Sequence, residues 1–211
     1  DALPAAFAER MESRFGWRAD PRRVEVLTDV VQGIYVAIDQ FSAPGEGVVV
    51  QTPVYPPFLS AVRELARRLV EAPLVAGDTR YEIDFDQLRA AIDPTTRVFL
   101  LCNPQNPTGR VFERRELEAL AEIAIAHDLV VVADEIHAPV VYAGSPPFTP
   151  YLTVPGGERG FSVFSPSKGW NLAGLKSALA MAGSAAVDDF ARLSEVHTHG
   201  SSHIGAIAHV A

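Results

Sequence analysis

Leu129-Val130-Val131-Val132-Ala133, followed at once by Asp134, is an uninterrupted apolar run that ends in a carboxylate. Runs in which apolar residues do not alternate with polar ones indicate a strand covered on both faces, and therefore a parallel sheet. Similar runs predict strands at residues 24–27, 47–51 and 97–101, with weaker candidates at 69–74, 161–164 and 177–180. The centre of the fold is thus expected to be a buried, mostly parallel sheet.

Amphipathic stretches separate these runs. They predict helices at residues 5–15, 30–41, 57–68, 85–92 and 113–127. In the last of these, Leu117, Leu120, Ala121 and Ala124 share one stripe, as a helix packed on a core requires. Strands that alternate with helices imply an α/β layered fold.

The amino-acid composition excludes several classes of protein. The chain has 211 residues, of which 48% are apolar, so it can bury a large core and is not disordered. A net charge of −8 argues against a nucleic-acid-binding surface. No apolar run approaches the roughly 18 residues of a membrane span. The single cysteine, Cys102, suits a reducing cytoplasm, and the start at Asp1 leads us to expect part of a longer protein.

The residues that follow the strands carry the chemistry. Ligands of open parallel sheets bind beyond the carboxyl ends of the strands. Those ends are followed by Tyr55, by the loop 102–109 with Asn106, by Asp134 and by Ser165-Pro166-Ser167-Lys168. An aromatic ring, an amide, a carboxylate and a lysine flanked by serines suit a flat, phosphorylated, electron-poor ring that is held by a covalent amine.

Four motifs in this order resemble one enzyme family. They are Gln51-Thr52-Pro53-Val54-Tyr55-Pro56-Pro57-Phe58, Asn103-Pro104-Gln105-Asn106-Pro107-Thr108-Gly109, Asp134-Glu135-Ile136-His137, and Ser165-Pro166-Ser167-Lys168 with its continuation to Lys176. Together they resemble the class I/II aminotransferases of fold type I, which depend on pyridoxal 5′-phosphate (PLP), and are most similar to the cystathionine β-lyase-like branch. The resemblance implies a three-layer α/β fold with a mostly parallel seven-stranded sheet. Residues 1–211 would form an incomplete large PLP-binding domain, without the family's N-terminal segment and C-terminal small domain.

The resemblance also implies roles for single residues. Lys168 would bond covalently to PLP and act as the catalytic base, and Asp134 would pair with the pyridine nitrogen. Asn106 would donate to the phenolic oxygen of the ring, and Tyr55 would stack on its face. His137 lies where other branches have a tyrosine near the ring oxygen, and its role stays open between a structural and a catalytic hydrogen bond.

The phosphate of the cofactor would be held at the start of the helix 30–41. Ser165, Ser167 and Lys176 would bind it together with the backbone N–H groups of Val30 and Val31. Two residues depart from the common pattern, because many relatives have Gly-Ala in place of Val30-Val31 and arginine in place of Lys176. Ser165 has a second interpretation, as a cap for the following helix.

The implied activity is a PLP-dependent carbon–sulfur β-lyase that acts on a small sulfur-containing amino acid such as cystathionine. An aminotransferase and a non-catalytic regulatory or interaction module are the alternatives. We also expect a homodimer, because sites of this family form between two subunits and because the stretch 140–153, with Phe148 and Tyr151, is too apolar for a solvated loop.

Neither the histidines near the C-terminus nor the single cysteine indicates a functional site. The histidines His197, His199, His203 and His209 lack the regular spacing of a metal site and have no cysteine nearby, so we expect no metal. Cys102 is expected to be a buried, small apolar residue.

Overall fold

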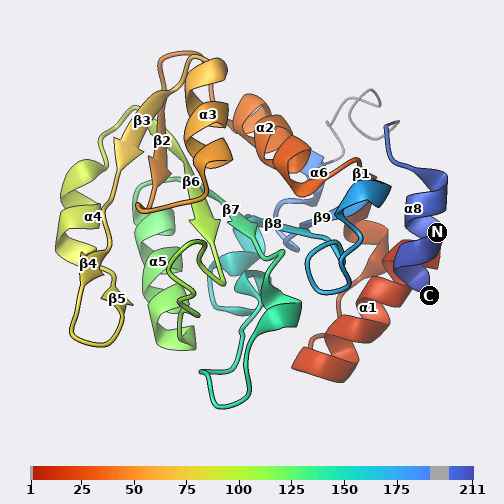
Figure 1. Ribbon diagram of the computed structural model, residues 1–211. Helices are drawn as coiled ribbons and strands as arrows, with labels where there is room; N and C mark the ends of the chain where they lie inside the picture. Colours follow the sequence, from red (N-terminus) through yellow and green to blue (C-terminus); the bar gives the residue numbers. More distant parts are fainter. Residues whose placement is uncertain (1, 191–199) are drawn as a thin grey trace.

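A seven-stranded sheet forms the centre of the molecule, in the order β1-β9-β8-β7-β6-β2-β3 (Figure 1). The computed structural model describes residues 2–190 and 200–211. The strands are β1 (Val24–Leu27), β2 (Gly47–Val50), β3 (Arg68–Glu71), β6 (Thr96–Cys102), β7 (Val130–Asp134), β8 (Phe161–Phe164) and β9 (Ala178–Ala182). Parallel pairing joins β3, β2, β6, β7 and β8, whereas β9 is antiparallel to its neighbours β8 and β1. The prediction of a mostly parallel seven-stranded sheet is confirmed.

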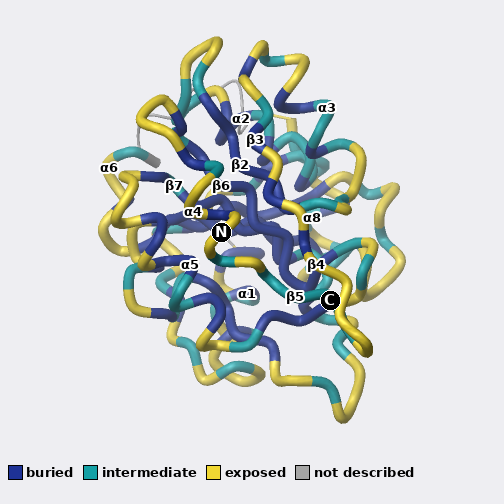
Figure 2. The backbone as a smooth tube through the Cα atoms, turned by 90° about the vertical axis from the view of Figure 1, so that its left-hand side faces the viewer, coloured by how far each residue is buried: buried dark blue, intermediate teal, exposed yellow. Residues whose placement is uncertain are grey.

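The side chains of the central strands divide between two clusters, one on each face. Val48 and Val50 of β2 pack with α2 (Val30–Phe41) and α3 (Pro56–Glu64). Val49, between them, packs on the opposite face with α4 (Phe85–Ala91) and α5 (Arg114–Ala126). Because both faces are covered, the strands are apolar throughout, and the molecule has the predicted three layers. Figure 2 shows the resulting buried core through the middle of the molecule.

The end of the sheet formed by β1 and β9 is covered by α1 (Ala2–Phe15). Leu3, Phe7 and Met11 of this helix pack against Phe164 and Met181 of the sheet. The short α6 (Val187–Phe190) and α8 (His203–Val210) follow β9, and α8 lies beside α1, so the two ends of the chain lie close together (Figure 1). The 3₁₀ turns are η1 (Pro21–Arg23), η2 (Ala138–Val140), η3 (Tyr151–Thr153), η4 (Gly157–Arg159) and η5 (Ala173–Leu175).

Several boundaries differ from the sequence prediction. The helix predicted at 57–68 ends at Glu64, because Ala66 adopts a positive φ of 58° and the chain turns into β3. The strand predicted at 69–74 ends at Glu71, where its pairing with Val50 of β2 ends. A two-stranded hairpin of β4 (Val75–Ala76) and β5 (Tyr81–Glu82) was not predicted. The first helix begins at Ala2, three residues before its predicted start.

In the apolar stretch 140–153, residues 148–151 are buried against the rest of the chain. Tyr151 is 1% exposed within the core, and the ring of Phe148 lies 5.0 Å from that of Phe15. These two aromatic residues are therefore shielded from solvent, as their apolar character requires, but by their own chain, so they give no support to an interface with a partner chain. Val140 and Tyr142, at 44% and 83% exposed, remain accessible.

The described residues contain neither a membrane-spanning helix nor a cluster of metal ligands. None of their helices combines the length and the apolar character that crossing a membrane requires. They contain no group of three or more His, Cys, Asp or Glu side chains that could hold a metal ion. His197 and His199 lie outside the described residues.

Candidate active site

The carboxyl ends of β6, β7 and β8 open into a cavity of about 150 Å³, which also meets the first turns of α2 and α3. Its lining contains all ten residues that the sequence singled out: Val30, Val31, Tyr55, Asn106, Asp134, His137, Ser165, Ser167, Lys168 and Lys176. These residues are up to 146 positions apart in the chain, and the parallel sheet brings them to one edge. The lining also includes Asp29, Cys102, Ile136, Ala173 and Ser177.

Asp134, the last residue of β7, is a buried carboxyl group. Its Oδ1 accepts a hydrogen bond of 3.0 Å from the backbone N–H of Ile136. Burial raises the pKa of Asp134 to about 7, although this hydrogen bond and the charge of Lys168 both lower it. A carboxyl group with such a pKa is suited to receive a cationic N–H group, whose charge would favour the ionised form.

The loop 102–109 is held by its buried residues. Asn103 is fully buried and its Oδ1 accepts from the N–H of Phe112 at 3.0 Å, while Gln105 donates to the carbonyl of Pro53 at 3.1 Å. Asn106, by contrast, lines the cavity. Two polar residues of this motif therefore fix the loop, and one is available to a ligand. Cys102 is buried as predicted, and its Sγ accepts from the Asn106 N–H at 3.4 Å.

Lys168 lies in the turn after β8, where Ser165 organises the backbone. The Ser165 hydroxyl donates to the carbonyl of Ser177 at 2.8 Å and accepts from the N–H of Ser167 at 3.1 Å. Its single proton is therefore already used within the chain. Turns follow Ser165, and η5 begins only at Ala173 with Leu172 as its N-cap, so the interpretation of Ser165 as a helix cap is wrong. Ser167 and Lys168 both line the cavity.

The side chain of Lys176 lies at the start of α2, although the two are far apart in the sequence. Its Nζ lies 2.8 Å from Oδ2 of Asp29, the N-cap residue of α2, and the two residues are 147 positions apart. The other oxygen of Asp29 accepts from the N–H of Gln32 at 2.8 Å. The ammonium group and the first turn of α2, which the sequence assigned to a phosphate, thus lie together beside Val30 and Val31.

Tyr55 and His137 complete the lining. Tyr55 is the N-cap residue of α3 and is 38% exposed, so its ring borders the cavity without being enclosed in the core. His137 donates a hydrogen bond to the carbonyl of Pro104, which raises its pKa, but burial and the charge of Lys168 outweigh this bond and lower it. His137 is therefore neutral at pH 7.

The sequence analysis gave no role in the cavity to Asp29 and Ser177, which also line it. Asp29 stands directly before α2 and caps it through the hydrogen bond from Gln32, and it also binds Lys176. Ser177 is 2% exposed, and its hydroxyl has no recorded partner among the described residues. No sequence signal distinguishes Ser177 from an ordinary strand residue.

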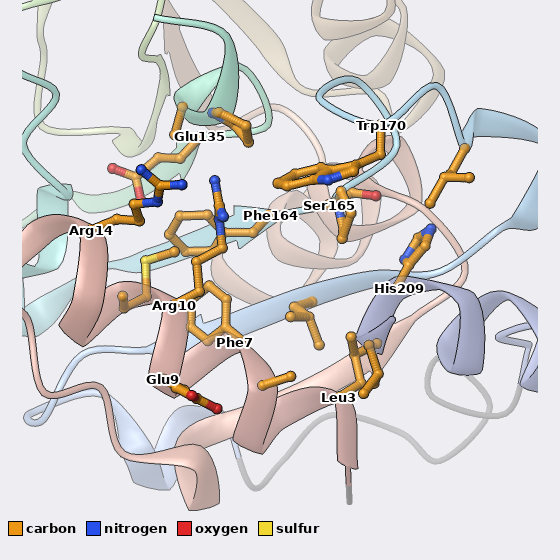
Figure 3. A pocket seen from close by; sticks show the side chains of 18 of the residues that line it. Leu3, Phe7, Glu9, Arg10, Arg14, Glu135, Phe164, Ser165, Trp170 and His209 are labelled. Atoms are coloured by element: carbon orange, nitrogen blue, oxygen red, sulfur yellow. The ribbon is translucent and has the colours of Figure 1, made fainter.

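A larger cavity, of about 440 Å³, lies between α1, α8 and the turn after β8 (Figure 3). Most of its lining is apolar, and the Arg10 guanidinium stacks 4.6 Å from the ring centre of Trp170. Of the ten predicted residues it contacts only Ser165, and it contains neither Lys168 nor Asp134. The smaller cavity therefore carries the candidate chemistry.

Known proteins resemble this chain in sequence and in fold. Residues 1–211 match the family described as aminotransferase class I and II. Cystathionine beta-lyase PatB of Bacillus subtilis is 38% identical over 79% of this chain and 44% of its own length. The structure of cystalysin from Treponema denticola, whose title states that it contains pyridoxal 5′-phosphate, has a TM-score of 0.92 at 26% identity, over 99% of this chain and 54% of that one.

An aminotransferase is similar as well. The structure of N-succinyldiaminopimelate aminotransferase from Mycobacterium tuberculosis has a TM-score of 0.87 at 29% identity, over 98% of this chain and 55% of that one. The chain spans about half the length of the curated relatives it matches. Because the family match extends over every residue, this chain belongs to the class I and II aminotransferase family.

Proposed function

We propose that the intact protein is a PLP-dependent carbon–sulfur β-lyase that cleaves a small sulfur-containing amino acid such as cystathionine. The observation that carries this proposal is the meeting of Lys168, Asp134 and Asn106 in one cavity. The choice of the lyase branch of the family rests on the named relatives, because Cystathionine beta-lyase PatB is 38% identical to this chain.

The donors in the cavity fit PLP. Asp134 is a buried carboxyl group whose raised pKa calls for a cationic partner, which a protonated pyridine nitrogen would supply. The Lys176 ammonium and the N-terminus of α2 offer the charge and the N–H groups that a phosphate needs. Lys168 provides an amine for the covalent link, and Tyr55 an aromatic face at the border of the same cavity. Ser167 and the unpartnered hydroxyl of Ser177 are further candidates for the phosphate.

Each residue then has a defined task. When bound, PLP supplies a sink for the electron pair that remains at Cα of the substrate after proton removal. Lys168 would take the Cα proton as general base. Asp134 would keep a proton on the ring nitrogen, and Asn106 would donate to the phenolic oxygen. The Cβ–S bond breaks with departure of the thiolate, so that cystathionine and water give homocysteine, pyruvate and ammonia.

The test incubates the intact protein with PLP and cystathionine, and measures pyruvate and free thiol. Both are expected in equal amounts, and a Lys168→Ala variant should form neither. Transfer of the amino group to an added 2-oxo acid without release of thiol would instead identify an aminotransferase. That alternative is favoured by the 29% identical N-succinyldiaminopimelate aminotransferase, and the residues of the cavity serve both reactions.

A non-catalytic module is distinguished by binding alone. A covalent link between PLP and Lys168 produces a visible absorption band, which Lys168→Ala should abolish. A wild-type protein that never develops this band with added PLP would favour the module.

A further inference from the structure

An acidic residue, Asp29, caps the N-terminus of α2 at the place where the cofactor's phosphate is proposed to bind. Asp29 lines the cavity next to Val30 and Val31, and its carboxylate is about one third exposed. A phosphate monoester carries a charge of about −1.5 to −2 at pH 7, so a carboxylate in this position is an unexpected neighbour. Its contacts explain what it does there.

Both oxygens of Asp29 are engaged by donors suited to an anion. Lys176 Nζ lies 2.8 Å from Oδ2, and the backbone N–H of Gln32 lies 2.8 Å from Oδ1. Burial would raise the pKa of Asp29, but the hydrogen bonds from Lys176 and Gln32, with a smaller contribution from the Val31 N–H, outweigh it. The pKa is lowered, and the carboxylate is ionised at neutral pH.

These donors are the ones a phosphate would use. An anion at a helix N-terminus is held by the unpaired N–H groups of the first turn and by the helix dipole, and here Lys176 adds the cationic side chain. Asp29 neutralises the charge of Lys176 and accepts from the first turn of α2. A phosphate that enters must share these donors with a carboxylate or displace it from them.

We propose that Asp29 is an internal competitor of the cofactor's phosphate, which weakens the binding of phosphorylated ligands by holding Lys176 and the first turn of α2. This inference rests on the proposed function, because it concerns the phosphate end of the same site. A substitution of Asp29 would then change the affinity for PLP without changing any contact with the pyridine ring.

The test replaces Asp29 by Asn in the intact protein. Asparagine is as good an N-cap as aspartate, so α2 keeps its cap while the negative charge is lost. The dissociation constant of PLP, measured from the visible absorption of its link to Lys168, is expected to fall about five- to tenfold, at a factor of ten per roughly 1.4 kcal/mol. The dissociation constant of pyridoxal, which has the same ring without the phosphate, should stay unchanged.

Asp84→Asn is the matched control. Asp84 caps α4 in the same way, with its Oδ1 accepting from the N–H groups of Asp86 and Gln87, and it is not among the residues that line the cavity. This variant should leave the affinities for both PLP and pyridoxal at the wild-type values. Any effect common to the two variants is therefore an effect of the cap.

Inorganic phosphate separates this inference from the proposed function. Its binding to cofactor-free protein, followed by calorimetry, should tighten in Asp29→Asn even in a protein that forms no link between PLP and Lys168. Absence of the link in the wild type would refute the proposed function alone. Unchanged or weaker binding of both PLP and phosphate in Asp29→Asn would refute the competitor role, and weaker binding would make Asp29 a residue that positions Lys176.

Discussion

At the residue scale, Asp134 combines features that rarely occur together. It ends a strand whose last four residues are buried, it lines a cavity, and among the described residues its side chain accepts one hydrogen bond, from the N–H of Ile136. The neighbouring Glu135 points to the other side of the strand end, where its Oε1 accepts from the Tyr151 N–H at 2.7 Å. Asp134 therefore lines the cavity, whereas Glu135 binds the backbone of Tyr151 in the core, although the two acidic residues are adjacent in the sequence.

Asp134→Asn is expected to keep PLP bound but to lose most activity. The phosphate contacts and the link to Lys168 persist, whereas a neutral amide cannot hold a proton on the ring nitrogen. The rate should fall by several orders of magnitude, at tenfold per roughly 1.4 kcal/mol of barrier. Visible absorption measures the bound cofactor, and pyruvate formation measures the rate. Near-normal turnover in this variant would show that the carboxylate is only structural.

The stability of the cofactor-free protein should fall as the pH rises from about 4 to 8. Burial raises the pKa of Asp134 to about 7 and that of Glu135 to about 8, above their values in the unfolded chain. Stability from such groups is complete below the unfolded pKa, near 4, and is lost as the pH passes the folded values. Urea titrations across this range should show a loss on the order of a few kcal/mol that is smaller in Asp134→Asn. Equal pH dependence in both proteins would contradict the raised pKa.

At the element scale, the loop after β6 is fixed by a buried arginine. Arg110 is 5% exposed and donates to the carbonyls of Tyr81 and Val111 at 2.7 and 2.9 Å, and it forms an ion pair with the buried Glu116 of α5. It therefore ties the β4–β5 hairpin to the first turn of α5 and to the loop that carries Asn106. Glu116 in turn accepts from the Glu113 N–H at 2.7 Å.

Arg110→Met should destabilise the protein by about 3–5 kcal/mol, because it leaves the Glu116 carboxylate buried without its cation. Arg114→Met is the control. Arg114 lies on α5, the helix that contains Glu116, its side chain is about half exposed, and it pairs with Glu118 at 3.6 Å. The control should change the free energy of unfolding by no more than about 0.5 kcal/mol. Urea unfolding followed by circular dichroism measures both, and similar losses in the two variants would refute a special role for Arg110.

The elements also show which features a sequence can predict. Strands such as β7 are covered on both faces, so their apolar runs mark them, and the polar residues that follow mark the site. The end of α3 depends on a positive φ at Ala66, and the β4–β5 hairpin depends on contacts of Arg110 with residues about 30 positions away. Likewise the bond between Asp29 and Lys176 joins the loops next to the neighbouring strands β1 and β9, and the two residues lie 147 positions apart in the sequence. Local patterns hold no signal for such long-range contacts.

At the scale of the whole molecule, we predict that the intact protein is a homodimer. Phe148 and Tyr151 pack internally and no longer support this expectation, but Ile204 and Ile207 of α8 are 72% and 59% exposed. Exposed large apolar residues that lie close together favour an interface. Native mass spectrometry should give twice the chain mass. A stable monomer that is fully active would refute the prediction.

Cofactor binding should stabilise the entire fold. The cavity draws residues from α2, α3 and the ends of β6, β7 and β8, so its assembly requires the sheet to be complete. A ligand that binds only the folded protein at 100 times its dissociation constant adds about 2.7 kcal/mol to the free energy of unfolding. Thermal unfolding of the intact protein should therefore shift to higher temperature as PLP is added, and less so in Lys168→Ala, which lacks the covalent link. Pyridoxal should give a smaller shift than PLP, because it cannot use Lys176 and the first turn of α2. If PLP left the unfolding temperature unchanged at concentrations that saturate the visible band, the cofactor would be bound outside this cavity.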